Sequence, residues 1–301
     1  MPFTPDYPVN PERQAYTEYA QTGDGRTGIL MLHGYMGSPL SSRNMAKFLA
    51  ARGITVHCPL LPGHGQYPDK LKGVKREQWR AEAAEGYEFI SRQCDEVFLM
   101  GHSMGAVLGA GLCRQRPEIK GLIMLTPVYD TPDDRLNLFR WLYPVVPWFY
   151  PTWMPSKRMR KLVRERVLDY DPTMDLDDPA VQKQLPKLTR IPTGSLVEML
   201  KMIDYGRTIW PDFHHPTIMF HGKSDPAVKP GSIEKLYEIL PNDDKQLFSF
   251  PDSGHEVMRT LDPAHEEVWQ RTYEFVRERS EIGLPDRDTA VSHPDVSSDS
   301  S

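Results

Sequence analysis

One short run of the sequence combines a hydroxyl group with glycines at the spacing of a nucleophilic turn. Gly101-His102-Ser103-Met104-Gly105 has the pattern G-x-S-x-G. The β-rich residues 96–100 precede it and small residues, 106–110, follow it, which predicts a strand, a sharp turn and a helix. The nucleophile in such a turn has a strained backbone, and neighbours without bulky side chains leave its hydroxyl exposed. We therefore predict that Ser103 is a catalytic nucleophile.

A serine hydroxyl is a poor nucleophile at neutral pH, so it needs a general base and a third group that orients the base. His255 follows the last apolar run, 246–250, and Asp225 follows the preceding one, 217–220. Both residues should lie at the carboxyl edge of a sheet, where we expect His255 to be the base and Asp225 the orienting acid. The sequence leaves three alternative acids near the same loops: Asp204, Asp212 and Asp252.

The negative charge that develops on a substrate oxygen during acyl transfer requires preorganised donors, normally two backbone N–H groups. One belongs to the residue after the nucleophile, which is Met104. The second comes from the loop after an early strand. The pair His33-Gly34 marks this loop, so we predict that the N–H of Tyr35 is the second donor. Three histidines are interpreted as residues that shape or brace loops and transfer no proton: His33, His64 and His102.

Short apolar runs recur along the chain and alternate with helix-like stretches. Such runs are typical of strands buried on both faces of a sheet. The alternation predicts an α/β fold with a mainly parallel, doubly wound sheet. The expected strands are 28–32, 54–59, 97–100, 122–125, 217–220 and 246–250, and the expected helices include 42–52, 76–93, 106–116 and 232–240.

Residues 127–213 interrupt this alternation with several helix-like stretches and no clear strand. The segment is too long for an ordinary connection. We therefore expect a helical cap inserted into an α/β core formed by residues 1–126 and 214–279. Residues 280–301 are rich in Ser and Asp and contain almost no large apolar residue, which predicts a disordered acidic tail.

The predicted cap contains an aromatic stretch with three of the six tryptophans, Trp141, Trp148 and Trp153, which are candidates for substrate binding. A basic run, 157–166, follows it; its members are Lys157, Arg158, Arg160, Lys161, Arg164 and Arg166, against Glu165 alone. We interpret these features as an apolar acyl pocket roofed by a solvated basic helix. The alternative is peripheral contact with a membrane, which aromatic and basic side chains together would suit.

The charge of the chain argues against nucleic-acid binding. The formal net charge is −5 at pH 7, and residues 280–301 supply −4 of it through five acids and one arginine. The remaining body is therefore near −1, which attracts neither nucleic acid nor anionic lipid over long range. Every apolar run is well short of the ~20 residues that span a bilayer, so the composition predicts a soluble globular protein.

The cysteines and the paired histidines give no sign of a metal site. Cys58, Cys94 and Cys113 lack a C-x-x-C spacing, so we expect buried thiols in a reducing compartment. The N-terminus has no apolar secretion signal, and the cytoplasm is the expected location. The adjacent His214 and His215 would point to opposite faces on entering a strand, so no metal site is predicted.

Five motifs together resemble those of α/β-hydrolases, specifically carboxylesterases and monoacylglycerol lipases. They are His33-Gly34-Tyr35-Met36-Gly37, Leu61-Pro62-Gly63-His64-Gly65, the Ser103 turn, His221-Gly222 with Asp225, and Gly254-His255. The chain order Ser103, Asp225, His255 is also the order expected of this fold. The resemblance covers about residues 28–279. It implies hydrolysis of a small, lipid-like carboxylic ester through an acyl-enzyme, with no metal and no cofactor.

Other functions on the same fold remain open at this point. A small-molecule binding protein would keep the fold and turn over slowly or not at all, although the complete triad argues against it. A thioesterase, an acyltransferase that excludes water, and a hydrolase of carbon–carbon bonds would use the same three residues.

Overall fold

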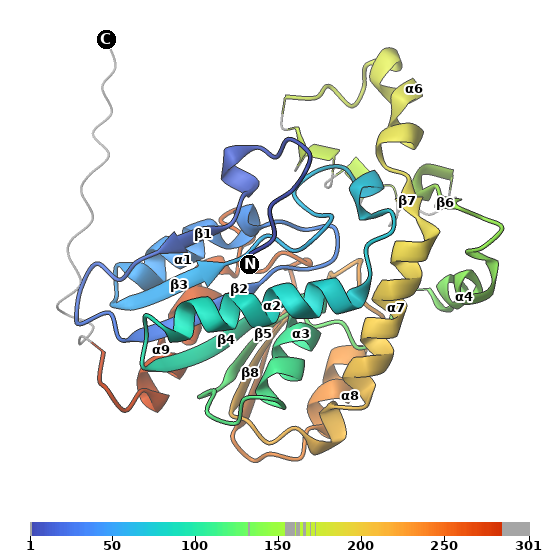
Figure 1. Ribbon diagram of the computed structural model, residues 1–301. Coiled ribbons are helices and arrows are strands. Elements are labelled where there is room, and N and C mark those ends of the chain that lie inside the picture. The colour runs from blue at the N-terminus through green and yellow to red at the C-terminus, as the bar shows by residue number, and fades with distance from the viewer. Residues whose placement is uncertain are drawn as a thin grey trace, which may run out of the picture.

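The computed structural model describes residues 2–131, 133–153, 160, 163–164, 167–168, 170–171 and 173–284 (Figure 1). Within these residues the central sheet has seven strands in the order β1-β3-β2-β4-β5-β8-β9. The strands are β1 Tyr16–Glu18, β2 Thr27–Leu32, β3 Ile54–Cys58, β4 Glu96–His102, β5 Leu122–Leu125, β8 Thr217–Gly222 and β9 Lys245–Phe250. Neighbouring strands are parallel except β1, which runs antiparallel to β3.

Helices cover both faces of this sheet (Figure 1). One face packs against α1 Arg43–Ala50 and α9 His265–Arg279, and the other against α2 Arg76–Ser91, α3 Met104–Cys113, α7 Thr193–Arg207 and α8 Ser232–Ile239. The sequence of strand β2 is continuously apolar because side chains on both faces of the strand are buried. Ile29 and Met31 pack toward the first face, while Leu30 and Leu32 pack toward the second. The predicted doubly wound α/β fold is confirmed.

Every strand predicted in the core is present, with bounds that differ by at most two residues at either end. Strand β1 was not predicted, because three residues in a proline-rich opening are too short to form a pattern. The expectation of no strand between β5 and β8 is wrong. Two short strands, β6 Trp148–Phe149 and β7 Ile191–Pro192, pair antiparallel there. A two-residue strand gives no alternation that a sequence pattern can detect.

Residues 127–213, called the insertion below, leave the sheet after β5 and return before β8. Its described helical elements are η4 Asp134–Leu138, α4 Phe139–Leu142, η5 Pro151–Trp153, α6 Pro179–Leu188, α7 and η6 Trp210–Asp212. Helix α7 also belongs to the core packing. A Cβ at Gly206 would lie 3.1 Å from Val107 on α3, so the two helices approach closely. The long helix therefore joins the insertion to the helix layer of the core, where α3 packs on the sheet.

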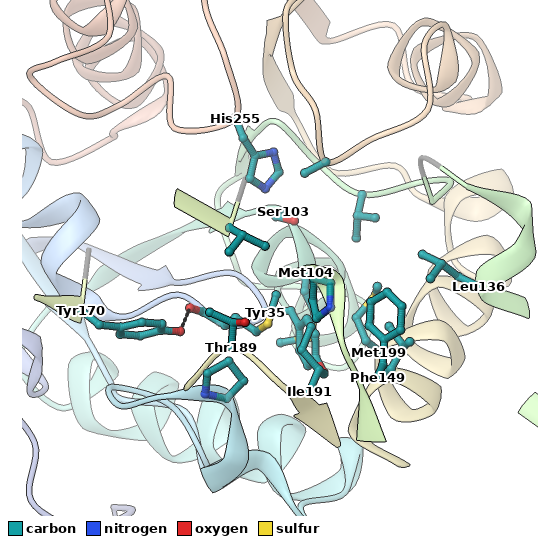
Figure 2. Close-up of a pocket in the computed structure, with 17 residues that line it drawn as sticks. Tyr35, Ser103, Met104, Leu136, Phe149, Tyr170, Thr189, Ile191, Met199 and His255 are labelled. Atoms are coloured by element: carbon teal, nitrogen blue, oxygen red, sulfur yellow. Dashed lines mark hydrogen bonds between the residues drawn. The ribbon is translucent and has the colours of Figure 1, made fainter. Parts of the chain in front are cut away.

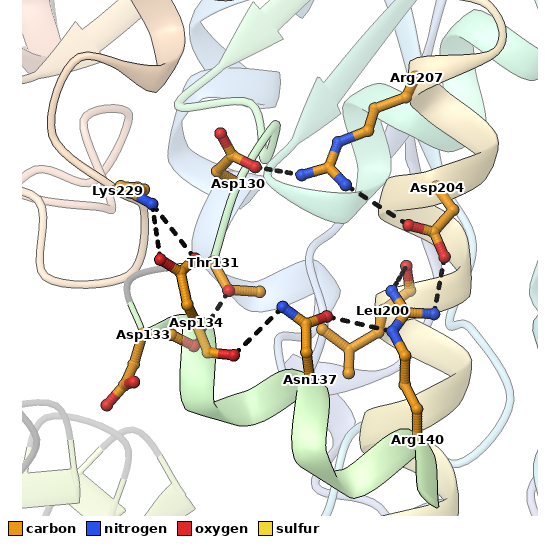
Figure 3. Close-up of polar contacts among 10 residues, drawn as sticks. All are labelled: Asp130, Thr131, Asp133, Asp134, Asn137, Arg140, Leu200, Asp204, Arg207 and Lys229. Carbon is orange, nitrogen blue, oxygen red and sulfur yellow. Dashed lines mark hydrogen bonds and ion pairs between the residues drawn. The ribbon is translucent and has the colours of Figure 1, made fainter.

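Ion pairs hold the start of the insertion to α7 and to a core loop (Figure 3). Arg140 Nη1 lies 2.7 Å from Asp204 Oδ2, and Arg207 also pairs with Asp204. Lys229, in the loop between β8 and α8, lies 2.9 Å from Asp134 Oδ2. Surface ion pairs contribute little stability singly, but together they restrict how the insertion sits on the core.

Part of the predicted acidic tail lies against the core. Ser280 Oγ donates to Glu96 Oε2 at 2.6 Å, and the Glu281 N–H donates to Glu96 Oε1 at 2.9 Å. Leu284 packs against the apolar cluster beneath α9. Residues 285–301 lie outside the described residues, as do the predicted basic residues Lys157, Arg158, Lys161 and Arg166.

The three cysteines are buried thiols, as predicted. Burial raises the pKa of Cys58 to about 12 and that of Cys94 to about 11, so both keep their protons at neutral pH. Among the described helices, none combines the length and the apolar character that a membrane crossing requires.

Candidate active site

Ser103 lies in a tight turn between β4 and α3. Its backbone angles, φ 54° and ψ −115°, fall in a region that residues with side chains rarely adopt. Glycine is required on both sides of it. A Cβ at Gly101 would lie 2.3 Å from Ala106 N, and a Cβ at Gly105 would lie 1.9 Å from Leu32 O. The turn closes only because these glycines lack side chains, and it presents Ser103 at the carboxyl end of β4.

Asp225 and His255 lie side by side on the loops that follow β8 and β9. His255 Nδ1 is 2.7 Å from Asp225 Oδ2, and the Ala227 N–H donates to Asp225 Oδ1 at 2.6 Å. Burial alone would raise the pKa of Asp225, but the charge and hydrogen bond of His255, with the Ala227 N–H, hold it below its usual value. An ionised carboxylate only accepts, so Nδ1 donates, and Nε2 is the ring nitrogen that can take a proton.

The alternative acids lie elsewhere. Asp204 forms ion pairs within the insertion, the side chain of Asp212 is 93% exposed, and Asp252 is exposed. Of the four candidate acids, Asp225 is the one whose described contacts include His255. The position of Asp225 therefore fits the role of the orienting acid best.

Gly222 allows the two loops to meet. A Cβ there would lie 2.0 Å from Gly254 O, closer than any side chain can approach a backbone oxygen. We expect Gly222→Ala to lower the free energy of unfolding by about 1–3 kcal/mol, because the Asp225 and His255 loops must separate. Urea denaturation measures this loss.

Gly254→Ala is the matched control, since a Cβ at that position meets no atom within 4 Å. It should unfold at nearly the wild-type urea concentration. Equal stability of the Gly222→Ala and Gly254→Ala variants would contradict the close approach of the two loops.

Two side chains that sequence analysis did not place in the site fix the backbone of His255. The carbonyl of His255 accepts hydrogen bonds from Thr126 Oγ1 at 2.8 Å and lies 2.9 Å from His102 Nε2. Thr126 follows β5 with φ 42°, unusual for a β-branched residue. A lone threonine after a strand forms no pattern, whereas His102 was expected to shape its own turn only.

His33 and His64 brace loops, as predicted. His33 Nε2 accepts from the Leu61 N–H at 3.1 Å and so joins two of the motif loops. His64 Nδ1 lies 3.0 Å from Pro62 O. In the part of the chain that the structure describes, no three His, Cys, Asp or Glu side chains gather as metal ligands would.

The two residues predicted to bind the oxyanion, Tyr35 and Met104, lie on segments that pass beside Ser103. Met104 is the first residue of α3, so its N–H has no acceptor within the helix and lies at the positive end of the helix dipole. Tyr35 lies in the loop after β2, which passes so close that a Cβ at Gly34 would be 3.1 Å from Ser103 Cβ. Tyr35, Met104, Ser103 and His255 all line one cavity.

That cavity has a volume of about 140 Å³ and is mostly apolar (Figure 2). The insertion supplies much of its wall through Leu136, Phe149, Ile191, Leu196 and Met199. Among the described lining residues there is no Asp, Glu, Lys or Arg. The site can therefore receive an uncharged apolar group beside the hydroxyl of Ser103.

The candidate tryptophans do not line this cavity. Trp141 and Trp153 are 84% and 70% exposed, and Trp148 is half-buried with the Arg190 guanidinium 4.1 Å from its ring centroid. Phe149 contributes to the wall instead. Successive side chains of a strand point to opposite sides, so Trp148 faces away when Phe149 faces the cavity.

The model of the family described as serine aminopeptidase, S33 matches residues 23–262, a span that includes the Ser103 turn and the loops of Asp225 and His255. The chain belongs to this family. Within the serine aminopeptidase, S33 family its fold is that of the α/β-hydrolases, as the sheet order and the paired helix layers indicate.

Two relatives match most of this chain, and a solved structure shares its fold. A thermostable monoacylglycerol lipase from Bacillus sp. (strain H-257) is 25% identical over 269 residues, which cover 89% of this chain and 96% of the lipase. A carboxylesterase from Bacillus subtilis (strain 168) is 25% identical over 254 residues, 84% of this chain and 93% of the esterase. A solved structure of a metagenome-derived lipolytic enzyme superposes with a TM-score of 0.71 at 22% identity, covering 90% and 100% of the two chains, and shares the fold.

Proposed function

We propose that this α/β-hydrolase is a serine hydrolase that cleaves carboxylic esters of apolar acyl groups, with Ser103, His255 and Asp225 as its triad. One observation carries the proposal: the strained serine and the histidine paired with Asp225 line the same apolar cavity. The names of the relatives, a monoacylglycerol lipase and a carboxylesterase, support ester hydrolysis.

The reaction proceeds in two halves. Ser103 Oγ attacks the ester carbonyl carbon while His255 Nε2 takes the hydroxyl proton, and the Asp225 carboxylate stabilises the imidazolium. The N–H groups of Tyr35 and Met104 bind the oxyanion. The C–O bond of the ester breaks, the alkoxide leaves with the proton from His255, and Ser103 carries the acyl group. Water activated by His255 then attacks this ester and releases the acid.

The described lining of the cavity supports an ester substrate over the peptide substrate that the family description suggests. An aminopeptidase must hold the positive α-amino group of its substrate, and a buried ammonium group requires a carboxylate or several acceptors. The described lining residues include no Asp or Glu. An uncharged acyl chain needs no such partner, so the cavity favours a lipid-like ester.

The insertion, residues 127–213, acts as a cap that covers the acyl chain, while residues 1–126 and 214–279 form the catalytic core. Leu136, Ile191 and Met199 lie on three separate elements of the insertion and meet around the cavity. Because these side chains enclose the substrate, the acyl-length preference should follow the shape that the insertion gives to the cavity.

Hydrolysis of p-nitrophenyl esters from acetate to palmitate, together with monoacylglycerols and aminoacyl p-nitroanilides, tests this function. We expect ester turnover with a chain-length optimum and no turnover of the anilides. Turnover of the anilides by the same serine would contradict the substrate class. A folded protein that hydrolyses none of these compounds would contradict the assignment as an ester hydrolase.

The exposed surface of the insertion carries apolar side chains, as expected for a protein that takes its substrate from a lipid surface. Large apolar side chains are exposed there and include Leu138, Trp141, Val145 and Trp153. Tryptophan and aliphatic side chains together suit a membrane interface. We expect the protein to pellet with phosphatidylcholine vesicles at low salt, and the variant Trp141→Ser/Val145→Ser to bind about tenfold more weakly, since two apolar side chains no longer leave water.

Leu261→Ser is the matched control for vesicle binding. Leu261 is 90% exposed but lies outside the insertion, in the segment between β9 and α9 that also carries His255. This variant should pellet like the wild type. Failure of the wild-type protein to pellet, or an equal loss in the Leu261→Ser variant, would contradict membrane contact through the insertion.

A further inference from the structure

The loop that carries the Tyr35 N–H has an unusual backbone. Met36, the next residue, has φ 59°, although it carries a long side chain. Residues other than glycine hold this conformation only when surrounding contacts impose it. The Gly37 N–H donates to Gly34 O at 3.0 Å and closes the turn from within. Two further hydrogen bonds reach the same loop from the insertion.

The first comes from Tyr170, whose hydroxyl donates to Met36 O at 3.0 Å (Figure 2). The ring of Tyr170 is itself held by the core. Its centroid lies 5.1 Å from that of Tyr67, and the Arg13 guanidinium carbon lies 4.6 Å from it. These contacts on the ring fix the direction from which the hydroxyl meets the Met36 carbonyl.

The second involves Ser195, a buried residue in the first turn of α7. Ser195 Oγ donates to Pro192 O at 2.8 Å and lies 2.8 Å from the hydroxyl oxygen of Tyr35. Because the single proton of Ser195 is directed to Pro192, the Tyr35 hydroxyl must be the donor in this pair. Burial raises the pKa of Tyr35, so this hydroxyl keeps its proton.

The insertion thus holds residues 35 and 36 at two points, the side chain of Tyr35 and the carbonyl of Met36. We propose that Tyr170 and Ser195 are positioning residues that orient the backbone N–H of Tyr35 toward the oxyanion. This inference rests on the proposed function. Donors stabilise a developing charge most when they are oriented before the reaction. The insertion then contributes to transition-state stabilisation in addition to enclosing the acyl chain.

Two variants, Tyr170→Phe and Ser195→Ala, test this role, and Tyr67→Phe is the matched control. Tyr67 belongs to the same aromatic contact, but its hydroxyl makes no hydrogen bond among the described residues. Loss of one hydrogen bond to the loop should lower kcat for a p-nitrophenyl ester by about three- to tenfold, with KM within about twofold of wild type. The control should keep the wild-type kcat.

A trifluoromethyl ketone with the same acyl chain as the ester gives an independent readout. Ser103 Oγ adds to its carbonyl carbon, and the carbonyl oxygen becomes an oxyanion. Its affinity should fall in Tyr170→Phe and Ser195→Ala by the same factor as kcat, while a non-reactive methyl ketone binds as in the wild type. Wild-type kcat in both variants, a change in KM alone, or an equal loss in Tyr67→Phe would overturn the inference and leave the proposed function intact. Lack of Ser103-dependent turnover in the wild-type protein would contradict the proposed function, and this inference with it.

Discussion

Replacing Ser103 with alanine is expected to lower kcat/KM for ester hydrolysis by about 10⁴- to 10⁶-fold. The change removes the attacking oxygen, and the remaining groups can only bind and polarise the ester. The protein should stay folded, because alanine retains the Cβ and the backbone of the turn. Its cavity should still bind apolar esters, which displacement of a fluorescent fatty acid measures.

A suitable control is Ser91→Ala, at the end of α2, where the hydroxyl donates to Glu88 O within the same helix and to no other acceptor among the described residues. It should retain full activity. If Ser103→Ala kept more than about one-tenth of the wild-type rate, another nucleophile would have to carry the reaction.

The second large effect is expected for Asp225→Asn, which should lower kcat by about 10³- to 10⁴-fold. An asparagine amide can donate to His255 Nδ1, which would leave the proton on Nε2, the nitrogen that must receive it from Ser103. Asp252→Asn is the control, because this exposed carboxylate lies in the same loop as His255. A similar loss in both variants, or activity of Asp225→Asn near the wild-type level, would exclude Asp225 as the orienting acid.

The lowered pKa of Asp225 adds a pH-dependent readout for the same variant. A carboxyl group whose pKa is lower in the folded chain than in the unfolded chain stabilises the fold above the unfolded value. That contribution disappears as the pH falls through the folded value. The unfolding free energy of the wild type should therefore decline more steeply in acid than that of Asp225→Asn.

The core could be predicted from the sequence because its strands are buried on both faces. Such strands appear as uninterrupted apolar runs, as in β4, and the glycine-rich loops that follow them are equally visible. The short strands β1, β6 and β7 could not be predicted, since two or three residues carry no period. Their positions depend on partners that are distant in the sequence, such as β3 for β1.

The candidate site divides in the same way. Ser103, Asp225 and His255 each follow a strand, so the parallel sheet dictates that they lie at one edge. The wall of the cavity could not be predicted, because whether Trp148 or Phe149 faces it depends on the pairing of β6 with β7. Thr126 and Tyr170 were missed because each acts through one hydroxyl, which belongs to no recurring pattern.

Trapping the covalent intermediate tests the central proposal most directly. Wild-type protein mixed with excess p-nitrophenyl ester should release a burst of p-nitrophenol. After quenching in acid during the first turnover, the tryptic peptide 93–114 should carry the mass of the acyl group, and fragmentation should place it on Ser103. The Ser103→Ala variant should show neither the burst nor the adduct. Acylation of a different residue, or steady hydrolysis that persists without Ser103, would contradict the account.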